Sequence, residues 1–183
     1  QVDEGDPNVS AGALTASIII IDRAGNTASP FTTLGPNNIS IDAVRPVITQ
    51  AYISSTDMHV SVGETVEITL QADHSGYSAS PLTRVNGVSV LDSNVVFSDT
   101  GSGLYKLIYT VEEDEGTVSE GELSIEVILV DSYGNESLKF TSLAPNNLAI
   151  YTDKPSAAIS GTTSICNGDS TRLTIIFGGV APW

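Results

Sequence analysis

The sequence contains an internal repeat, and this repeat limits how the chain can fold. Residues 1–46 align with residues 110–155 without a gap, and 18 of the 46 aligned pairs are identical. The most distinctive shared motif is Asp-x-x-Gly-Asn, found at residues 22–26 and again at residues 131–135. The period is about one hundred residues, which is a common size for a single domain. We therefore expect the chain to be divided into modules by the repeat.

The repeat predicts three segments. Residues 1–46 would be the C-terminal half of one repeat, residues 47–155 a complete repeat, and residues 156–183 the N-terminal part of a third. The third assignment rests on residues 168–175, which parallel residues 63–70. Half a module cannot bury a full core, and the first residue is glutamine rather than methionine. We therefore expect the chain to be a window on a longer repetitive polypeptide.

Short runs of alternating apolar and polar residues, separated by turn-forming residues, predict the fold class. In residues 64–72, Val66, Ile68 and Leu70 share one face. Asn86-Gly87 lies between two β-prone runs and is typical of a two-residue hairpin, because both residues accept positive φ. These signals predict an all-β fold built of β-sandwich modules.

Two further runs make specific predictions about burial. In residues 104–111, Tyr105, Leu107 and Tyr109 share one face. The opposite face carries Leu104, Lys106 and Ile108. The four consecutive isoleucines at residues 18–21 predict a strand that is buried on both faces or central in its sheet.

The charge balance excludes some partners and favours others. The formal net charge is −15, from 22 acidic and 7 basic residues. Such a surface repels phosphate backbones and anionic lipid, so we expect no nucleic-acid partner and no membrane surface. No apolar run approaches the roughly twenty residues that span a bilayer, so we expect no membrane insertion. Dissolved cations, above all Ca²⁺, are natural partners, although acidity also simply keeps an extracellular rod soluble.

The ends of the two aligned copies resemble a known kind of module. The pattern of a strand, Asp-x-x-Gly-Asn, a strand and Ile-Asp-x-x-x-Pro-x-Ile runs from Ile18 to Ile48, and residues 159–183 add a third variant. It resembles bacterial Ig-like repeats of large secreted surface adhesins, including gliding-motility adhesins that Bacteroidota export by the type IX route. The resemblance implies an all-β fold of tandem Ig-like β-sandwich modules in an elongated array, so that the three predicted segments are the C-terminal half of an Ig-like repeat, a complete one and the N-terminal part of a third. It also implies stalk modules on the bacterial cell surface, sometimes with Ca²⁺ between neighbours. Tyr151 departs from the pattern, because it stands where the first copy has Asp42.

The Asp-x-x-Gly-Asn motif has two interpretations. In the first it is a tight turn, in which aspartate caps its own backbone and glycine supplies positive φ. In the second it contributes to a structural Ca²⁺ site. The topology of a seven-strand sandwich would bring Asp131, Asn135, Asp73 and the linker residue Asp42 to one pole, where carboxylate and amide oxygens suit Ca²⁺.

The acidic run at residues 112–115 would lie at the opposite pole, beside Asp153. We expect a solvated loop there, with a weaker cation site as the alternative. The matching loop at residues 3–6 is also acidic and would point towards the first junction.

The sequence offers little that predicts catalysis. It has no Gly-x-Ser-x-Gly turn and no phosphate-binding glycine loop, so we expect no enzyme. His59 and His74 stand apart from any second zinc ligand, and whether Cys166 forms a disulfide is left open. A sugar-stacking surface could be formed by Tyr52, Tyr77, Tyr105, Tyr109 and Tyr133, but such residues are more often half-buried in strands. Tyr133 lies in the turn itself, so we expect it to be exposed, where it could pack against the neighbouring unit.

These observations favour a structural role, with two alternatives. The first hypothesis is a stalk or filament segment of a surface adhesin, whose partners are the neighbouring repeats of the same chain, with a glycan or protein bound at a distant tip. The second is an Ig-like module that itself binds a glycan or a protein. The third is an accessory domain of a secreted hydrolase.

Overall fold

The fold is all-β, as the sequence predicts. The computed structural model describes residues 1–113, 115–161 and 164–179, and these residues form strands, turns and extended segments without a helix. Accordingly, the described part of the chain has no helix that could cross a membrane.

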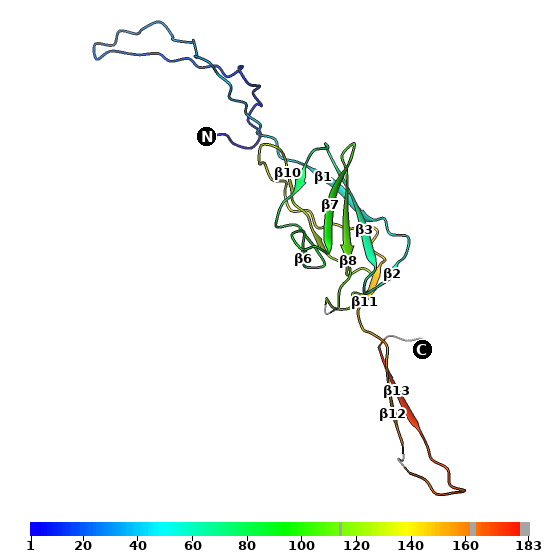
Figure 1. The fold of residues 1–183 in the computed structure, drawn as a ribbon. Helices are drawn as coiled ribbons and strands as arrows, with labels where there is room; N and C mark the ends of the chain where they lie inside the picture. The colour runs from blue at the N-terminus through cyan, green and yellow to red at the C-terminus, as the bar shows by residue number, and fades with distance from the viewer. Residues whose placement is uncertain (114, 162–163, 180–183) are drawn as a thin grey trace.

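The strands gather in the middle of the chain, with one further pair near its C-terminus (Figure 1). They are β1 (Ile48–Ile53), β2 (His59–Ser61), β3 (Thr65–Ala72), β4 (Ser78–Ala79), β5 (Arg84–Val85), β6 (Val88–Ser89), β7 (Val95–Gly101), β8 (Leu104–Thr110), β9 (Ile125–Glu126), β10 (Leu129–Val130), β11 (Ala149–Tyr151), β12 (Ser156–Ser160) and β13 (Thr174–Gly178).

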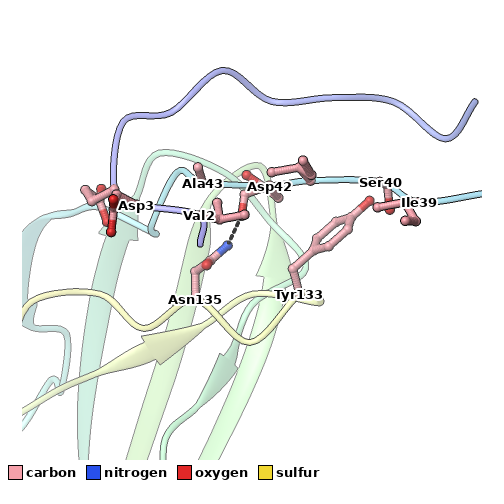
Figure 2. Close-up of a pocket in the computed structure, with 10 residues that line it drawn as sticks. Val2, Asp3, Ile39, Ser40, Asp42, Ala43, Tyr133 and Asn135 are labelled. Atoms are coloured by element: carbon pink, nitrogen blue, oxygen red, sulfur yellow. Dashed lines mark hydrogen bonds between the residues drawn. The ribbon is translucent and has the colours of Figure 1, made fainter. Parts of the chain in front are cut away.

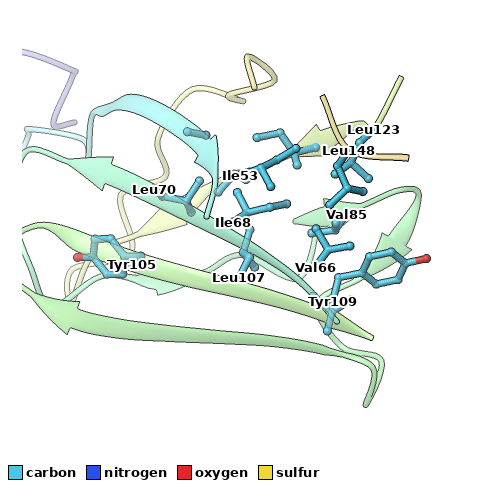
Figure 3. Packing of buried hydrophobic residues seen from close by; sticks show 14 of the residues in the cluster. Ile53, Val66, Ile68, Leu70, Val85, Tyr105, Leu107, Tyr109, Leu123 and Leu148 are labelled. Atoms are coloured by element: carbon cyan, nitrogen blue, oxygen red, sulfur yellow. The ribbon is translucent and has the colours of Figure 1, made fainter. Parts of the chain in front are cut away.

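A four-stranded antiparallel sheet forms one layer of the central unit, in the order β1-β3-β8-β7. Side chains alternate between buried and half-buried along β8, and the buried face is the one that the sequence predicts. Tyr105, Leu107 and Tyr109 are fully buried, and so are Val66, Ile68 and Leu70 of β3 (Figure 3). Burial of large apolar side chains provides most of the stability of such a layer.

The second layer is built from shorter strands. β5 pairs with both β6 and β9, and β10 pairs with β4. Asn86 and Gly87 form the predicted turn between β5 and β6, with φ of 51° and 80°. Leu123 and Leu129 point inward from this layer and join the same core cluster as β3 and β8. The two layers therefore enclose one core, and the central unit is a β-sandwich.

A parallel strand pair closes the sandwich. β11 pairs with β2, and Ala149 lies opposite His59. Val60 and Ile150 of this pair are buried. Residues 59–61 carry no strand prediction, because three residues are too few to show an alternation.

The repeat is visible in the backbone as well as in the sequence. Three isolated bridges within residues 1–46 recur at the aligned positions of residues 110–155: Val9–Ile41 as Val118–Ile150, Ile18–Phe31 as Val127–Phe140, and Ile21–Thr27 as Val130–Glu136. Residues 1–46 thus have the same hydrogen-bonding pattern as the matching part of the central unit.

The prediction that residues 18–21 form a buried strand is wrong for the described chain. Their isoleucines are between 53% and 69% exposed, whereas Val127, Ile128 and Leu129 at the matching positions are buried. Residues 1–41, which contain this segment, form a narrow extended arm that runs out from the sandwich (Figure 1). No second layer among the described residues lies over the arm, so its apolar side chains face solvent.

The C-terminal segment is a second extension. β12 and β13 form an antiparallel hairpin with Ser156 opposite Gly178, and their side chains are mostly exposed. Residues 162–163 and 180–183, which belong to the predicted third module, lie outside the described residues. The division at residues 46 and 155 stays a prediction.

Candidate functional site

The candidate site is the junction between the arm and the sandwich, and the turn at residues 131–135 lies at its centre. Asp131 Oδ1 accepts hydrogen bonds from the backbone N–H groups of Tyr133 (2.8 Å) and Asn135 (2.9 Å). Asn135 Nδ2 donates to Asp131 Oδ2 at 2.8 Å. Gly134 has a φ of 90°, a conformation that favours glycine. These contacts give the motif the geometry of a self-capped turn.

The first copy of the motif has the same geometry. Asp22 Oδ1 accepts from the backbone N–H groups of Ala24 (2.8 Å) and Asn26 (2.9 Å), and Asn26 Nδ2 donates to Asp22 Oδ2 at 2.8 Å. The hydrogen bonds from Asn26 lower the pKa of Asp22. Burial opposes ionisation of Asp131, but the hydrogen bonds from Asn135, Tyr133 and Gly134 together outweigh it and lower the pKa of this carboxyl too. Both carboxylates therefore favour the charged form, which is the better acceptor.

In the second copy, the turn also binds the linker, which is residues 42–46 between the arm and the central unit. Asn135 Nδ2 donates to the backbone carbonyl of Asp42 at 3.2 Å, as the dashed line in Figure 2 marks. The ring of Tyr133 points towards Ile39 and Ser40 of the incoming chain (Figure 2). All of these residues border an open pocket at the junction. The central unit thus binds the linker through Asn135, and Tyr133 faces the residues just before the linker.

The arm contacts the linker from the other side. Asn8 Oδ1 accepts from the backbone N–H of Ala43 at 2.8 Å, and the carbonyl of Ala43 accepts from Gly5 at 3.1 Å. Arg45 pairs with Glu4 at 2.6 Å. Ala43 is buried between these contacts. The linker is therefore hydrogen-bonded on both sides, which limits its freedom to bend.

Asp73 fixes the start of the central unit. Its Oδ1 accepts from the backbone N–H of Val47 (3.0 Å) and from the hydroxyl of Tyr77 (3.2 Å), and its Oδ2 lies 3.1 Å from His74 Nδ1. Burial alone would raise the pKa of Asp73, but these hydrogen bonds outweigh burial, and the net direction is downward. Burial and the charge of Asp73 together raise the pKa of Tyr77 to about 12.

The residues predicted to hold Ca²⁺ do meet at this pole. Asp42, Asp73 and Asp131 border a single pocket, and Asn135 lies beside Asp42 at the adjoining one. Each carboxylate nevertheless already accepts a backbone hydrogen bond. Asp42 Oδ1 accepts from Val44 at 3.1 Å, Asp73 from Val47, and Asp131 from its own turn. In the described ranges, no three acidic, histidine or cysteine side chains are arranged to hold a metal ion. The calcium site stays a prediction.

The acidic loop at the opposite pole is anchored in part. Glu115 accepts hydrogen bonds from Asn94 Nδ2 (2.9 Å) and from the hydroxyl of Tyr109 (2.6 Å). Burial, followed by the charge of Glu115, raises the pKa of Tyr109. Glu113 pairs with Lys154 of the next linker. The backbone N–H of Glu112 donates to Glu115 at 2.7 Å, and Asp114, the fourth acidic residue of the predicted run, lies outside the described residues.

The two junctions share an ion pair that was not predicted from the sequence. The pair Glu113–Lys154 occupies the positions that align with the pair Glu4–Arg45, so the same ion pair ties the acidic loop to the linker at both junctions. The signal was present in the alignment, which places glutamate on glutamate and a basic residue on a basic residue. We call these two pairs the junction ion pairs.

The histidines, the cysteine and the tyrosines considered as candidate site residues lie apart from the junction or in the core, except Tyr133, Tyr77 and His74. His59 stacks on Tyr151 with ring centroids 6.1 Å apart, and the His74 side chain is 77% exposed beside Asp73. Cys166 is a free, exposed thiol in the described chain. Tyr105 and Tyr109 belong to the core and cannot stack on a sugar, whereas Tyr133 is 58% exposed.

Comparison with known proteins adds a weak structural likeness. No family model matches the chain, and no curated protein matches it either. Among solved structures, domains 4–9 of the surface layer protein SbsC match over 98% of this chain, with 14% sequence identity and a TM-score of 0.19. The chain spans 41% of the length of that structure. A likeness this weak says nothing about function.

Proposed function

We propose that this chain is a spacer segment of a bacterial cell-surface protein, built of Ig-like repeats joined in tandem. The observation that supports this role best is the pair of junction ion pairs, because Glu4–Arg45 and Glu113–Lys154 tie two successive linkers in the same way. A junction that is built twice from matching residues suits a chain whose task is to set the distance and direction between modules. The partners of each repeat are then its neighbours in the same chain.

Charge and chemistry are consistent with such a spacer. A net charge of −15 keeps an extended molecule soluble and discourages lateral sticking. A spacer needs no catalytic residues, and Asp131 and Asn135 have structural contacts in the turn and with the linker. We propose that the protein is located outside the cell, at the bacterial surface. More specifically, we propose that it is exported by the type IX route and takes part in gliding adhesion.

Ca²⁺ at the first junction is a second part of the proposal. Asp42, Asp73 and Asp131 border one pocket, and a Ca²⁺ ion bound there would replace some of their present hydrogen bonds with metal bonds. Binding there would screen three negative charges and stiffen the linker. Titration of the chain with Ca²⁺, followed by amide chemical shifts of Asp131 and Asn135, tests this. Two results would count against a calcium site. One is that Mg²⁺ causes chemical-shift changes as large as those caused by Ca²⁺, and the other is that Asp73→Asn leaves the Ca²⁺-induced changes as they are in the parent chain.

The stiffness of the junction tests the spacer role. Spin labels at the exposed positions Ser10 and Ser119, in a Cys166→Ser background, report the distance across the linker. We expect one narrow distance distribution, which broadens when Arg45→Ala and Asn135→Ala remove the ion pair and the linker hydrogen bond. A distribution that is already broad in the parent chain would refute a spacer with a fixed direction.

A further inference from the structure

The arm presents an uncovered apolar face. Ile18, Ile20, Phe31 and Ile39 are each more than half exposed, although they lie on segments that pair with one another or adjoin such pairs. Exposed apolar residues that gather on one structural element mark an interaction surface more often than scattered ones do.

The same face occurs a second time in the molecule, where it is covered. Val127, Leu129 and Leu148 align with Ile18, Ile20 and Ile39 in the repeat, and all three are fully buried in the core cluster. Their cover is the sheet β1-β3-β8-β7, which supplies the inward side chains on the other side of that cluster.

The arm already has the conformation of a covered layer. Its three bridges match those of the central unit, and its asparagine contact does too. Asn37 Nδ2 donates to the carbonyl of Leu14 at 2.9 Å, as Asn146 Nδ2 donates to that of Leu123 at 2.9 Å. The face is therefore ordered before anything covers it, which lowers the conformational entropy lost on docking.

We propose that this face docks a β-sheet of the same sequence type as residues 48–110, covalently continuous with residue 1. In the central unit that sheet runs directly into the layer it covers, and Thr110 is the counterpart of Gln1. The docked sheet would place a short strand parallel to residues 40–42, because residues 149–151 hold β2 in this way. It would also accept a hydrogen bond from Gly35, as Ala51 does from Ala144.

A second copy of this chain is a poorer occupant. Its exposed hairpin, β12 with β13, would supply the counterparts of β1 and β3. It has no counterpart of β8 among the described residues, and β8 contributes Tyr105, Leu107 and Tyr109 to the core. A sheet with the β8 strand covers the face, and the hairpin alone leaves much of it in water.

The test adds the missing sheet to the full chain. A copy of residues 47–109 is placed directly before Gln1, and amide hydrogen exchange is compared with that of the parent chain. We expect the bridged amides of Ile18, Phe31 and Ile41 to exchange at least about tenfold more slowly in the extended chain, approaching their counterparts in the central unit.

Matched variants separate docking from a general effect of the extension. Ile20→Ser removes a residue whose counterpart, Leu129, is fully buried, whereas Ile21→Ser changes one whose counterpart, Val130, is half-buried. In the extended chain, Ile20→Ser should abolish most of the added protection, Ile21→Ser much less, and the conservative Ile20→Val should retain it. Neither serine variant should alter exchange in the unextended arm.

Two results would overturn the proposal. One is an arm that exchanges equally fast with and without the added sheet while the central unit keeps its protection. The other is protection of Ile18 in the unextended chain that rises with protein concentration, since this would make a second copy the occupant. Both outcomes are independent of cellular location and of linker stiffness, so the spacer role can fail while this proposal holds.

Discussion

Leu129 and Ile20 occupy the same position in the two copies of the repeat, and replacing each by alanine should have very different effects. Leu129 is fully buried, whereas Ile20 is 69% exposed. Truncation of a buried leucine costs about 2–5 kcal/mol, from lost transfer free energy and the cavity left behind. Truncation of an exposed side chain usually changes stability by less than about 0.5 kcal/mol. We therefore expect Leu129→Ala to lower the free energy of unfolding by about 3 kcal/mol and Ile20→Ala to leave it nearly unchanged.

The assay is urea and thermal unfolding of the full chain followed by circular dichroism. For a domain of about one hundred residues, each kcal/mol shifts Tm by about 4–8 °C, so Leu129→Ala should lower Tm by about 12–24 °C. The urea midpoint should fall without a change in slope, because the unfolded state exposes the same surface. Equal effects of the two substitutions, or a loss below about 1 kcal/mol for Leu129→Ala, would refute the assignment of one copy as core and the other as uncovered.

Three further predictions follow from the turns and the junction. Gly103→Ala should lower the free energy of unfolding by at least roughly 1–3 kcal/mol, because an added Cβ at this positive φ would lie 2.5 Å from the carbonyl oxygen of Ala72. Gly134→Ala meets open space, so it should cost only the strain of a positive φ, about 1–2 kcal/mol. The same unfolding assay measures both. Asn135→Ala should increase the exchange rate of the Asp131–Asn135 turn and broaden the distance distribution across the linker, and an unchanged distribution would show that the hydrogen bond to Asp42 is dispensable. The pKa of Asp131 is lower in the folded state than its unfolded value of about 3.9, so its stabilisation is present above that value and is lost as pH falls through the folded pKa; acid titration of stability should therefore be shallower in Asp131→Asn, and identical curves would contradict this.

Local chemistry made parts of the fold predictable from the sequence. The alternation in β3 and β8 identified the inward side chains, because one face of each strand is apolar throughout. Asn86-Gly87 identified its hairpin, because few other residue pairs accept two positive φ values. The meeting of Asp42, Asp73 and Asp131 at one pole followed from sandwich topology, which fixes where successive turns lie.

Other features depend on contacts that no local pattern encodes. Burial of Ile18 to Ile21 requires a second layer, and the periodicity of a strand does not say whether that layer is present. The strand β2 is too short to show alternation and exists because β11 pairs with it. The ion pair Glu113–Lys154 joins residues 41 positions apart, and its only sequence signal is its likeness to Glu4–Arg45.

The parallel pairing of β2 and β11 has a consequence for how the central unit responds to tension. β2 lies near the start of the unit and β11 at its end, and both run in the same direction. A force that pulls the two ends apart draws these strands past each other along their length. Their hydrogen bonds, from His59 opposite Ala149 to Ser61 opposite Tyr151, are then strained together in shear. An antiparallel pair pulled from adjacent ends would instead unzip one bond at a time.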